Sequence, residues 1–218
     1  MSTFICLGGM CLGGIILKRL PKEYGHTEIK TPVNNAVFVG GFKNVHLLFD
    51  GTFHKNFCCG SPNVVYKYID GDKHPHQWFN KYWRFPHTDF NRDDVVVNVR
   101  ERYDNMIKFI NNPSEDYWFL YSLNKWDVNL SENDIQKQLL NLSKYIDVNR
   151  IIFLGQEKYT GDKTMLCGYP VANNKFENRN DNFRKVVGDR YIVVSCSNVY
   201  ELATQDFIYN IENVIRGL

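Results

Sequence analysis

The segment from Phe4 to Arg19, FICLGGMCLGGIILKR, constrains the fold more than any other part of the chain. A short apolar run over residues 3–7 predicts a buried strand. This run breaks at a glycine pair and continues as an apolar stretch that ends on two basic residues before Pro21, as a helix does. A strand, a glycine turn and a helix place the residues of the turn at the carboxyl edge of a sheet. The residue in that turn is Cys11.

The chemistry of Cys11 depends on this position. A cysteine at a helix N-terminus lies in the positive end of the helix dipole, which lowers the pKa of a thiol and favours the reactive thiolate. The other interpretation is a small core residue beside glycines, since free cysteines are usually buried and inert. The spacing alone leaves both open.

Composition narrows the class of protein. The 218 residues are 44% hydrophobic and 15% aromatic, which indicates a folded chain, and we expect a single domain over residues 1–218. The net charge of +2 comes from interspersed charges, which gives no electrostatic signature of nucleic-acid or anionic-membrane binding. Six cysteines without a regular framework suggest reduced thiols, and the apolar segment 4–17 is too short to span a bilayer. We therefore expect a cytoplasmic protein with no membrane span.

Predicted helices and strands alternate in the second half of the chain. Helical spacing of apolar residues predicts helices over residues 95–110, 131–146 and 207–215, and apolar runs predict strands at 117–121, 150–154, 165–167 and 191–195. A hairpin strand is predicted at 64–69. This alternation favours an α/β fold, a three-layer structure with a mostly parallel sheet flanked by helices. Ligands of such sheets bind beyond the carboxyl ends of the strands.

Residues 73–94 are crowded with aromatic and histidine side chains and show no regular period. We expect this segment to be a long, ordered, aromatic-rich loop that packs over the domain, the kind of segment that often carries function.

A cysteine nucleophile needs a base within hydrogen-bond reach and a group that orients the base. The most suggestive histidine is His87, in the sequence FPHTDF of residues 85–90, where the proline fixes the backbone and the phenylalanines anchor the loop. Residues two apart on an extended chain face the same way, so Asp89 can reach the same pocket as His87. The alternative is a loop histidine whose flanking phenylalanines have the structural role.

Two other kinds of site are weaker. Residue types that bind zinc gather in one part of the chain: Cys58, Cys59, His74, His76 and His87. The cysteines are adjacent rather than in a C-x-x-C spacing, however, and no second ligand pair is present. The glycines around Cys11 fit neither G-x-x-x-x-G-K-[ST] nor G-x-G-x-x-G. We therefore expect no metal and no cofactor.

With Cys11 and His87 in view, the chain resembles a bacterial family of unknown function whose members are described as papain-like cysteine peptidases. Members begin with a strand, an "slGs-x-C" turn and a helix, matched here by residues 6–11, and continue with a "YPFDW" block, matched loosely by residues 31–35. An "FPHdF" block follows, matched by residues 85–90. The resemblance covers roughly residues 3–125, through an arginine-bearing helix and a hydrophobic strand.

The resemblance implies that Cys11 is the nucleophile, His87 the general base and Asp89 a residue that orients the histidine. Two positions depart from the family pattern, because Asn34 replaces its aspartate and Asn35 its tryptophan. A papain-like fold also differs from the α/β fold that the alternating pattern predicts.

Taken together, the chain is expected to be a cysteine-dependent hydrolase, peptidase-like, or an acyl transferase acting on a peptide, acyl or glycan conjugate. Backbone N–H groups of the turn would form the oxyanion hole, and the turn consists of Gly8, Gly9, Met10, Leu12 and Gly13 around the cysteine. The alternative is a non-catalytic interaction domain in which the turn and the aromatic loop form a groove for a glycan or a protein partner. A weaker third idea is a phosphate-binding enzyme that uses the same turn.

Overall fold

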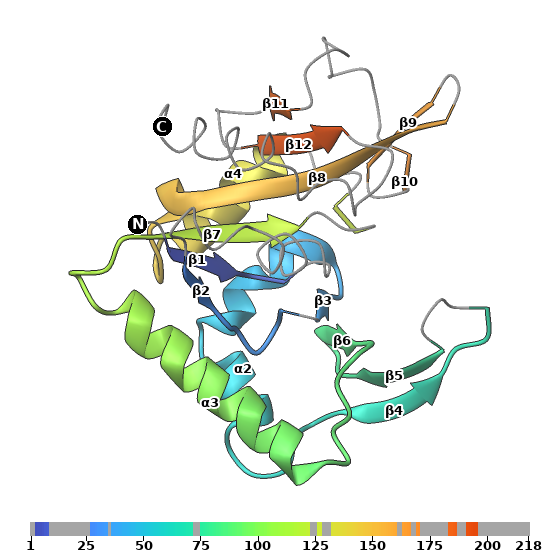
Figure 1. The fold of residues 1–218 in the computed structure, drawn as a ribbon, viewed down its shortest axis with the longest axis vertical. Helices are drawn as coiled ribbons and strands as arrows, with labels where there is room; N and C mark the ends of the chain where they lie inside the picture. Colours follow the sequence, from blue (N-terminus) through green and yellow to red (C-terminus); the bar gives the residue numbers. More distant parts are fainter. Residues whose placement is uncertain are drawn as a thin grey trace.

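The computed structural model describes residues 3–8, 27–34, 36–71, 75–122, 126–127, 132–160, 163–166, 169–170, 183–186 and 191–195. In this part of the chain, helices accompany a large sheet that contains parallel strands and a smaller antiparallel sheet (Figure 1). The predicted α/β character is confirmed at this level. The predicted helices before Pro21 and over residues 207–215 lie outside the described residues.

An eight-stranded sheet contains the parallel strands. These are β1 (Thr3–Cys6), β2 (Thr27–Ile29), β7 (Tyr117–Ser122), β8 (Ile151–Thr160) and β12 (Tyr191–Ser195). The strands β9 (Lys163–Leu166), β10 (Tyr169–Pro170) and β11 (Phe183–Val186) join it in antiparallel pairs. β9 overlaps the strand predicted at 165–167, whereas β10, β11 and the antiparallel pairing were not predicted. β1 lies between β2 and β7, so Thr3 is paired with Thr27 on one side and with Tyr117 on the other.

Both faces of the central strands are buried. Successive side chains of a strand point to opposite faces, and Ile5 and Phe119 belong to the main hydrophobic cluster. On the opposite face Cys6, Leu120 and Ile152 lie outside that cluster and are also completely buried. Burial on both sides explains why these strands are continuous apolar runs in the sequence.

The smaller sheet is antiparallel, with the order β3-β6-β5-β4. Its strands are β3 (Val37–Phe38), β4 (Val65–Tyr68), β5 (His76–Phe79) and β6 (Trp83–Phe85). The hairpin strand predicted at 64–69 is confirmed as β4. The long loop predicted for residues 73–94 is wrong, because the segment contains β5 and β6. Their alternation is hidden in the sequence because a polar residue, Gln77, occupies the buried position of β5.

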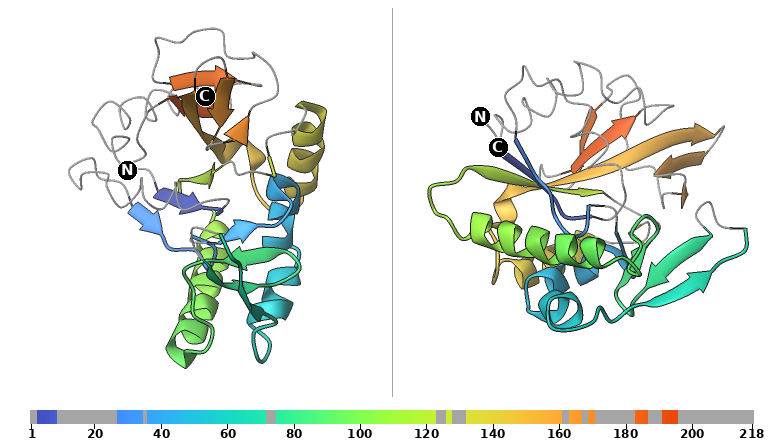
Figure 2. Two further views of the ribbon diagram at one scale, coloured as in Figure 1. Left: turned by 90° about the vertical axis from the view of Figure 1, so that its right-hand side faces the viewer. Right: turned by 60° about the horizontal axis from the view of Figure 1, so that its bottom comes forward.

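Five helical segments lie between the described strands: η2 (Gly41–Leu48), α2 (Thr52–Phe57), α3 (Asp93–Ile110), α4 (Glu132–Leu142) and η3 (Val148–Arg150). Of these, α3 connects the small sheet to the large one. α3 and α4 confirm two of the predicted helices. Asp93 and Asp94 occupy the first turn of α3 and Lys108 its last turn, an arrangement that the helix dipole favours. Figure 2 shows α2 and α3 below the parallel strands, next to one another.

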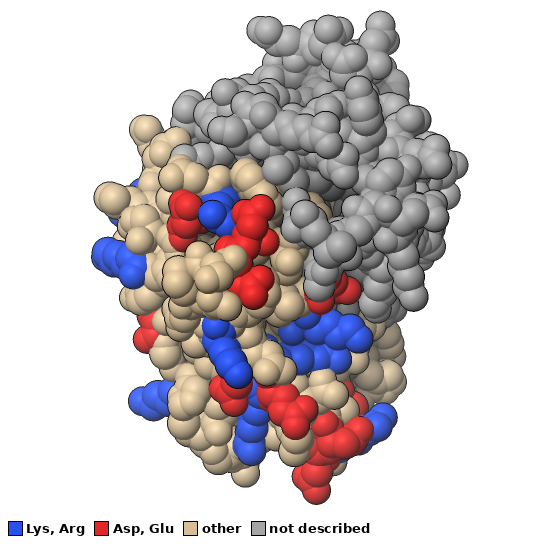
Figure 3. Space-filling view, turned by 60° about the vertical axis from the view of Figure 1, so that its left-hand side comes forward, with Lys and Arg blue, Asp and Glu red and all other residues tan. Residues whose placement is uncertain are grey.

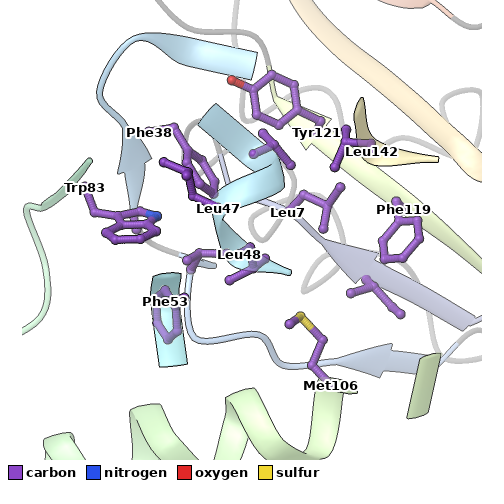
Figure 4. Packing of buried hydrophobic residues seen from close by; sticks show 14 of the residues in the cluster. Leu7, Phe38, Leu47, Leu48, Phe53, Trp83, Met106, Phe119, Tyr121 and Leu142 are labelled. Carbon is purple, nitrogen blue, oxygen red and sulfur yellow. The ribbon is translucent and has the colours of Figure 1, made fainter. Parts of the chain in front are cut away.

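One hydrophobic cluster joins the helices to both sheets. Figure 4 shows Leu7, which follows β1, together with Phe119 of β7, Trp83 of the small sheet and Met106 of α3 around the same interior. Phe53 of α2 lies at its aromatic centre, stacked on Tyr103 with ring centroids 5.2 Å apart. Such ring pairs add about 0.5–1.5 kcal/mol each beyond the area that they bury.

Among the described residues, no helix is both long enough and apolar enough to cross a membrane. The single domain over residues 1–218 stays a prediction, as does the second helical layer of a three-layer fold.

We expect alkaline pH to destabilise the fold through Tyr103. Burial, and next the nearby Cys58 and Asp104 side chains, raise the pKa of the Tyr103 hydroxyl from 10.0 to about 12. Because the folded-state pKa is raised, this contribution to stability is complete below about pH 10 and is lost as the pH rises towards 12. Urea unfolding across this range should show a steeper alkaline loss of stability for the native protein than for Tyr103→Phe. Tyr145→Phe, at an exposed position, is the control. Equal slopes for all three proteins would contradict the prediction.

Candidate functional site

The candidate site is the carboxyl edge of the parallel strands between β1 and β7. The chain runs from β1 to β2 on one side and later enters β7 on the other side of β1. Strand order reverses direction at this point, and open α/β sheets in general bind ligands at such a switch point. Gly8, the first residue of the predicted glycine turn, follows β1 at this edge.

Backbone hydrogen bonds attach Leu7 and Gly8, which follow β1, to β7. The N–H of Leu7 donates to the carbonyl oxygen of Leu120 at 2.8 Å, and the N–H of Ser122 donates to the carbonyl oxygen of Gly8 at 3.1 Å. Gly8 has φ +86°, and a Cβ built on it would lie 2.9 Å from the carbonyl oxygen of Val33 and 3.2 Å from that of Ala36. The third close atom is a ring carbon of Phe38 at 3.2 Å. Only glycine fits here without strain, because the φ is left-handed and the two carbonyl oxygens belong to the backbone.

A polar turn after β2 fixes the end of β1 from the other side. The buried Thr31 hydroxyl lies 2.7 Å from the carbonyl oxygen of Cys6 and 2.6 Å from Oδ1 of Asn34. The Asn34 amide donates to the carboxylate of Glu28 at 3.0 Å. Asn34 stands where the resembling family has aspartate, and an ionised aspartate could not donate this hydrogen bond.

Asp127 is a buried acidic side chain near the same edge that sequence reasoning missed. Its Oδ1 accepts the N–H of Phe42 at 2.7 Å, and its Oδ2 accepts the Tyr121 hydroxyl at 2.9 Å. Phe42 is in the first turn of η2, so the carboxylate caps that segment and attaches it to the end of β7. A Cβ at Gly41 would overlap this carboxylate. No local sequence signal marks Asp127, because the backbone N–H that it accepts belongs to a residue 85 positions away.

The proposed catalytic residues are only partly described. Cys11 and the turn residues Gly9, Met10, Leu12 and Gly13 lie outside the described residues. His87 and Asp89 are both exposed in the connection from β6 to α3. Oδ1 of Asp89 accepts the N–H of Asn91 at 3.1 Å.

The register of the small sheet relates His87 to the glycine turn. Val37 pairs with Arg84 and Phe38 with Trp83, so the carboxyl end of β6 points towards Ala36. The carbonyl oxygen of Ala36 is one of the atoms that crowd Gly8. The FPHTDF segment therefore leaves β6 on the Gly8 side of β3.

The structure contains a thiol–imidazole contact that was not predicted. Sγ of Cys59 lies 3.4 Å from Nδ1 of His54. His54 is in α2, Cys59 follows the helix, and both side chains are exposed. Its neighbour Cys58 is different, because burial, reinforced by Asp104, raises the pKa of the Cys58 thiol from 9.0 to about 11. Cys58 should therefore be a poor nucleophile at neutral pH.

The zinc ligands weighed from the sequence do not converge in the described part of the chain. No three histidine, cysteine, aspartate or glutamate side chains there lie close enough to hold a metal ion. His76 contacts tyrosines instead, with Nδ1 against the Tyr66 hydroxyl and its ring 5.2 Å from that of Tyr68. His74 lies outside the described residues.

Comparisons of the chain with protein-family models, with curated proteins and with solved structures found no match. The resemblance to papain-like cysteine peptidases stays a prediction that depends on the quoted motifs.

Replacing Gly8 should destabilise the protein through both backbone strain and crowding. We expect Gly8→Ala to lower the free energy of unfolding by about 2–4 kcal/mol, since a left-handed residue and a backbone clash each cost on the order of 1–2 kcal/mol. Gly60→Ala is the matched control, because Gly60 has φ +89° but nothing within 4 Å of its Cβ position. Urea denaturation of both variants measures the difference. Equal losses would mean that Gly8 is not crowded.

Removing the Tyr121 hydroxyl should weaken the attachment of η2. We expect Tyr121→Phe to cost about 1–3 kcal/mol in unfolding free energy, because the buried Asp127 carboxylate loses a hydrogen-bond donor. Tyr145→Phe, at an exposed site, should be near neutral. Amide exchange of Phe42 in the same variants reports on the cap directly. Unchanged exchange in Tyr121→Phe would show that the hydroxyl does not support η2.

Proposed function

We propose that the protein is a cysteine-dependent hydrolase or acyl transferase in which Cys11 is the nucleophile and His87 the general base. The observation that carries the proposal is the position of Gly8. Gly8 has a left-handed, crowded backbone and lies just after β1 at the switch point between β1 and β7, where the predicted glycine turn would begin. A nucleophile in that turn would be at the edge where open α/β sheets bind ligands.

Chain length supports the pairing of Cys11 with His87. Cys11 is three residues from Gly8, so their Cα atoms are at most about 11 Å apart. His87 is two residues from the end of β6, which limits the distance between its Cα and that of Phe85 to about 7 Å. The register of β6 directs this end towards Ala36, which crowds Gly8. Both side chains are thus tethered to the same part of the molecule.

The helix expected after the turn is part of the proposal, and so is the three-layer fold. The complete burial of Cys6, Leu120 and Ile152 on the second face supports a covering layer there. A helix that begins near Cys11 would direct the positive end of its dipole at the thiol and stabilise the thiolate. Cys6, Cys58 and Cys59 are free thiols, in keeping with the cytoplasmic setting that we propose.

The chemistry follows from these roles. His87 takes the thiol proton, and the Cys11 thiolate attacks the carbonyl carbon of the substrate, forming a C–S bond. N–H groups of the Gly8–Gly13 turn would stabilise the oxyanion, and His87 returns the proton to the leaving group as its bond breaks. Water, or an acceptor hydroxyl or amine, then attacks the thioester and releases Cys11. Asp89 would orient His87 through Oδ2, since Oδ1 accepts from Asn91.

Thiol labelling tests this proposal. Iodoacetamide is reacted with the native protein between about pH 5 and pH 9, and each labelled site is assigned by mass spectrometry. We expect Cys11 to react fast near pH 6 and His87→Ala to move its reactivity towards the free-thiol pKa of about 8.5. In acyl-substrate assays, Cys11→Ser should lower any measured activity by at least about 10³-fold.

Two internal controls make the labelling selective. Cys58 should stay slow throughout, because the pKa of its thiol is about 11. His54→Ala removes the imidazole next to Cys59 and should change the labelling of Cys59 without changing that of Cys11. A Cys11 that is inert, or that ignores His87→Ala, would overturn the catalytic proposal. The interaction domain that binds a glycan or a protein partner would then be the better interpretation.

A further inference from the structure

An open cleft of about 900 Å³ lies between α2 and one face of the antiparallel sheet, away from the Gly8 edge. It is lined by Thr52 and Asn56 of α2, by residues 63–65 with Lys67 and Ile69, and by the connection from β5 to β6. A volume of this size lies in the range of small-molecule sites, which are about 300–1,000 Å³.

The charge of the cleft is entirely positive. Four cationic side chains line it, Lys55, Lys67, Lys81 and Arg84, and no acidic residue is among the described lining residues. The whole chain has a net charge of only +2, and acidic and basic side chains are interspersed on the face shown in Figure 3. A cleft lined by one sign of charge focuses the field and attracts ligands of the opposite sign.

Strand alternation explains how the charges reach one face. In the sheet register, Lys67 of β4 pairs with Gln77 of β5. Phe79 of β5 pairs with Val65 on one side and with Arg84 of β6 on the other. Because paired residues and residues two apart point to the same face, these side chains share the face that lines the cleft. Oε1 of the fully buried Gln77 accepts a hydrogen bond from Nε of Arg84. This bond fixes the plane of the guanidinium, the cation that matches phosphate oxygens best.

The wall of the cleft is a connected set of amides. Oδ1 of Asn56 accepts from Nδ2 of Asn63 at 3.0 Å and from Nδ2 of Asn80 at 3.1 Å. Asn56 donates to the carbonyl oxygen of Thr52 at 2.8 Å, and Asn80 accepts the N–H of Tyr82 at 3.0 Å. The network links α2 to the sheet, so the wall is already ordered without a ligand.

Aromatic rings lie next to two of the cations. Nζ of Lys67 is 5.5 Å from the centre of the Phe79 ring, and Nζ of Lys81 is 5.2 Å from that of Tyr82. Trp126 also lines the cleft. Cation–π contacts hold the ammonium groups over the rings, and rings of this kind provide apolar surface for the uncharged part of a ligand.

From these observations we propose that the cleft binds a small phosphate ester, with the phosphate on the lysines and Arg84 and the organic part against the aromatic rings and asparagines. His87 is not among the residues that line the cleft, and the proposed binding uses neither Cys11 nor His87, so this inference does not depend on the proposed function. Nucleoside monophosphates and sugar phosphates share this chemistry, and the experiment distinguishes them.

Calorimetric titration of the full chain with adenosine 5′-monophosphate and with glucose 6-phosphate tests the inference. We expect at least one of them to bind, and binding to weaken as salt screens the charges. The ester that binds more tightly identifies the organic part. Lys67→Gln/Lys81→Gln should weaken binding at least about tenfold, since charge-assisted hydrogen bonds to phosphate are lost. Both lysines are exposed, so the variant should fold.

The matched control is Lys108→Gln/Lys144→Gln, which removes the same charge at exposed positions outside the cleft and should bind like the native protein. Three results would overturn the inference. Neither ester binds below about 1 mM, both double variants bind equally, or a single-stranded oligonucleotide binds more tightly than either ester. The third would identify the cleft as a nucleic-acid groove. None of these results changes the labelling of Cys11, so the two proposals can fail separately.

Discussion

The pairing of β1 with β7 continues beyond the strands to Gly8, and the carboxyl edge of the sheet depends on it. Ser122 donates to Gly8 from one side, and the backbone of Val33 and Ala36 closes on Gly8 from the other. A side chain here would push the segment that leads into β3 away from β1, because two of the crowding atoms are backbone carbonyl oxygens. The glycine therefore lets the small sheet approach the large one, and the same approach relates β6 and His87 to the start of the turn.

Hydrogen bonds between polar groups position the carboxyl edge of the large sheet, whereas the packing of aromatic side chains stabilises the core next to it. Thr31 and Asn34 hold the carbonyl of Cys6, and Asp127 connects η2 to Tyr121. Below them, Phe53 and Trp83 bring α2 and β6 together with ring centroids 5.3 Å apart. Hydrophobic burial is non-directional, so the hydrogen bonds are what select one register among the many that the aromatic residues would allow.

The helices and strands that were predicted from the sequence are those whose pattern of apolar residues extends over several turns or over a whole strand. α3 has several turns of apolar spacing, and β7 is a continuous apolar run, so both were predicted within a few residues. β5 and β6 were missed because each is short, and because Gln77 is buried by pairing with Arg84 rather than by being apolar. No local pattern can reveal a partner that lies on another strand.

In the candidate site, too, some residues could be predicted from the sequence and others could not. Gly8 belongs to the turn that the sequence indicated, and the structure adds the physical reason for a glycine there. Asp127 could not be found, since its hydrogen bond to the N–H of Phe42 joins residues 85 positions apart in the chain. The pairing of Cys11 with His87 stays a prediction, as do the role of Asp89 and the resemblance that suggested it.

The strand β4 has a consequence for the behaviour of the protein in solution. It lies at the end of the small sheet, and all four of its residues, including Tyr66 and Tyr68, are exposed. An exposed edge strand offers unpaired backbone groups to a second chain, and proteins commonly protect such edges with a lysine. Lys67 stands in the middle of this strand. The charge that faces the cleft is thus also the one that discourages edge-to-edge aggregation, and selection for solubility alone would keep a lysine at this position.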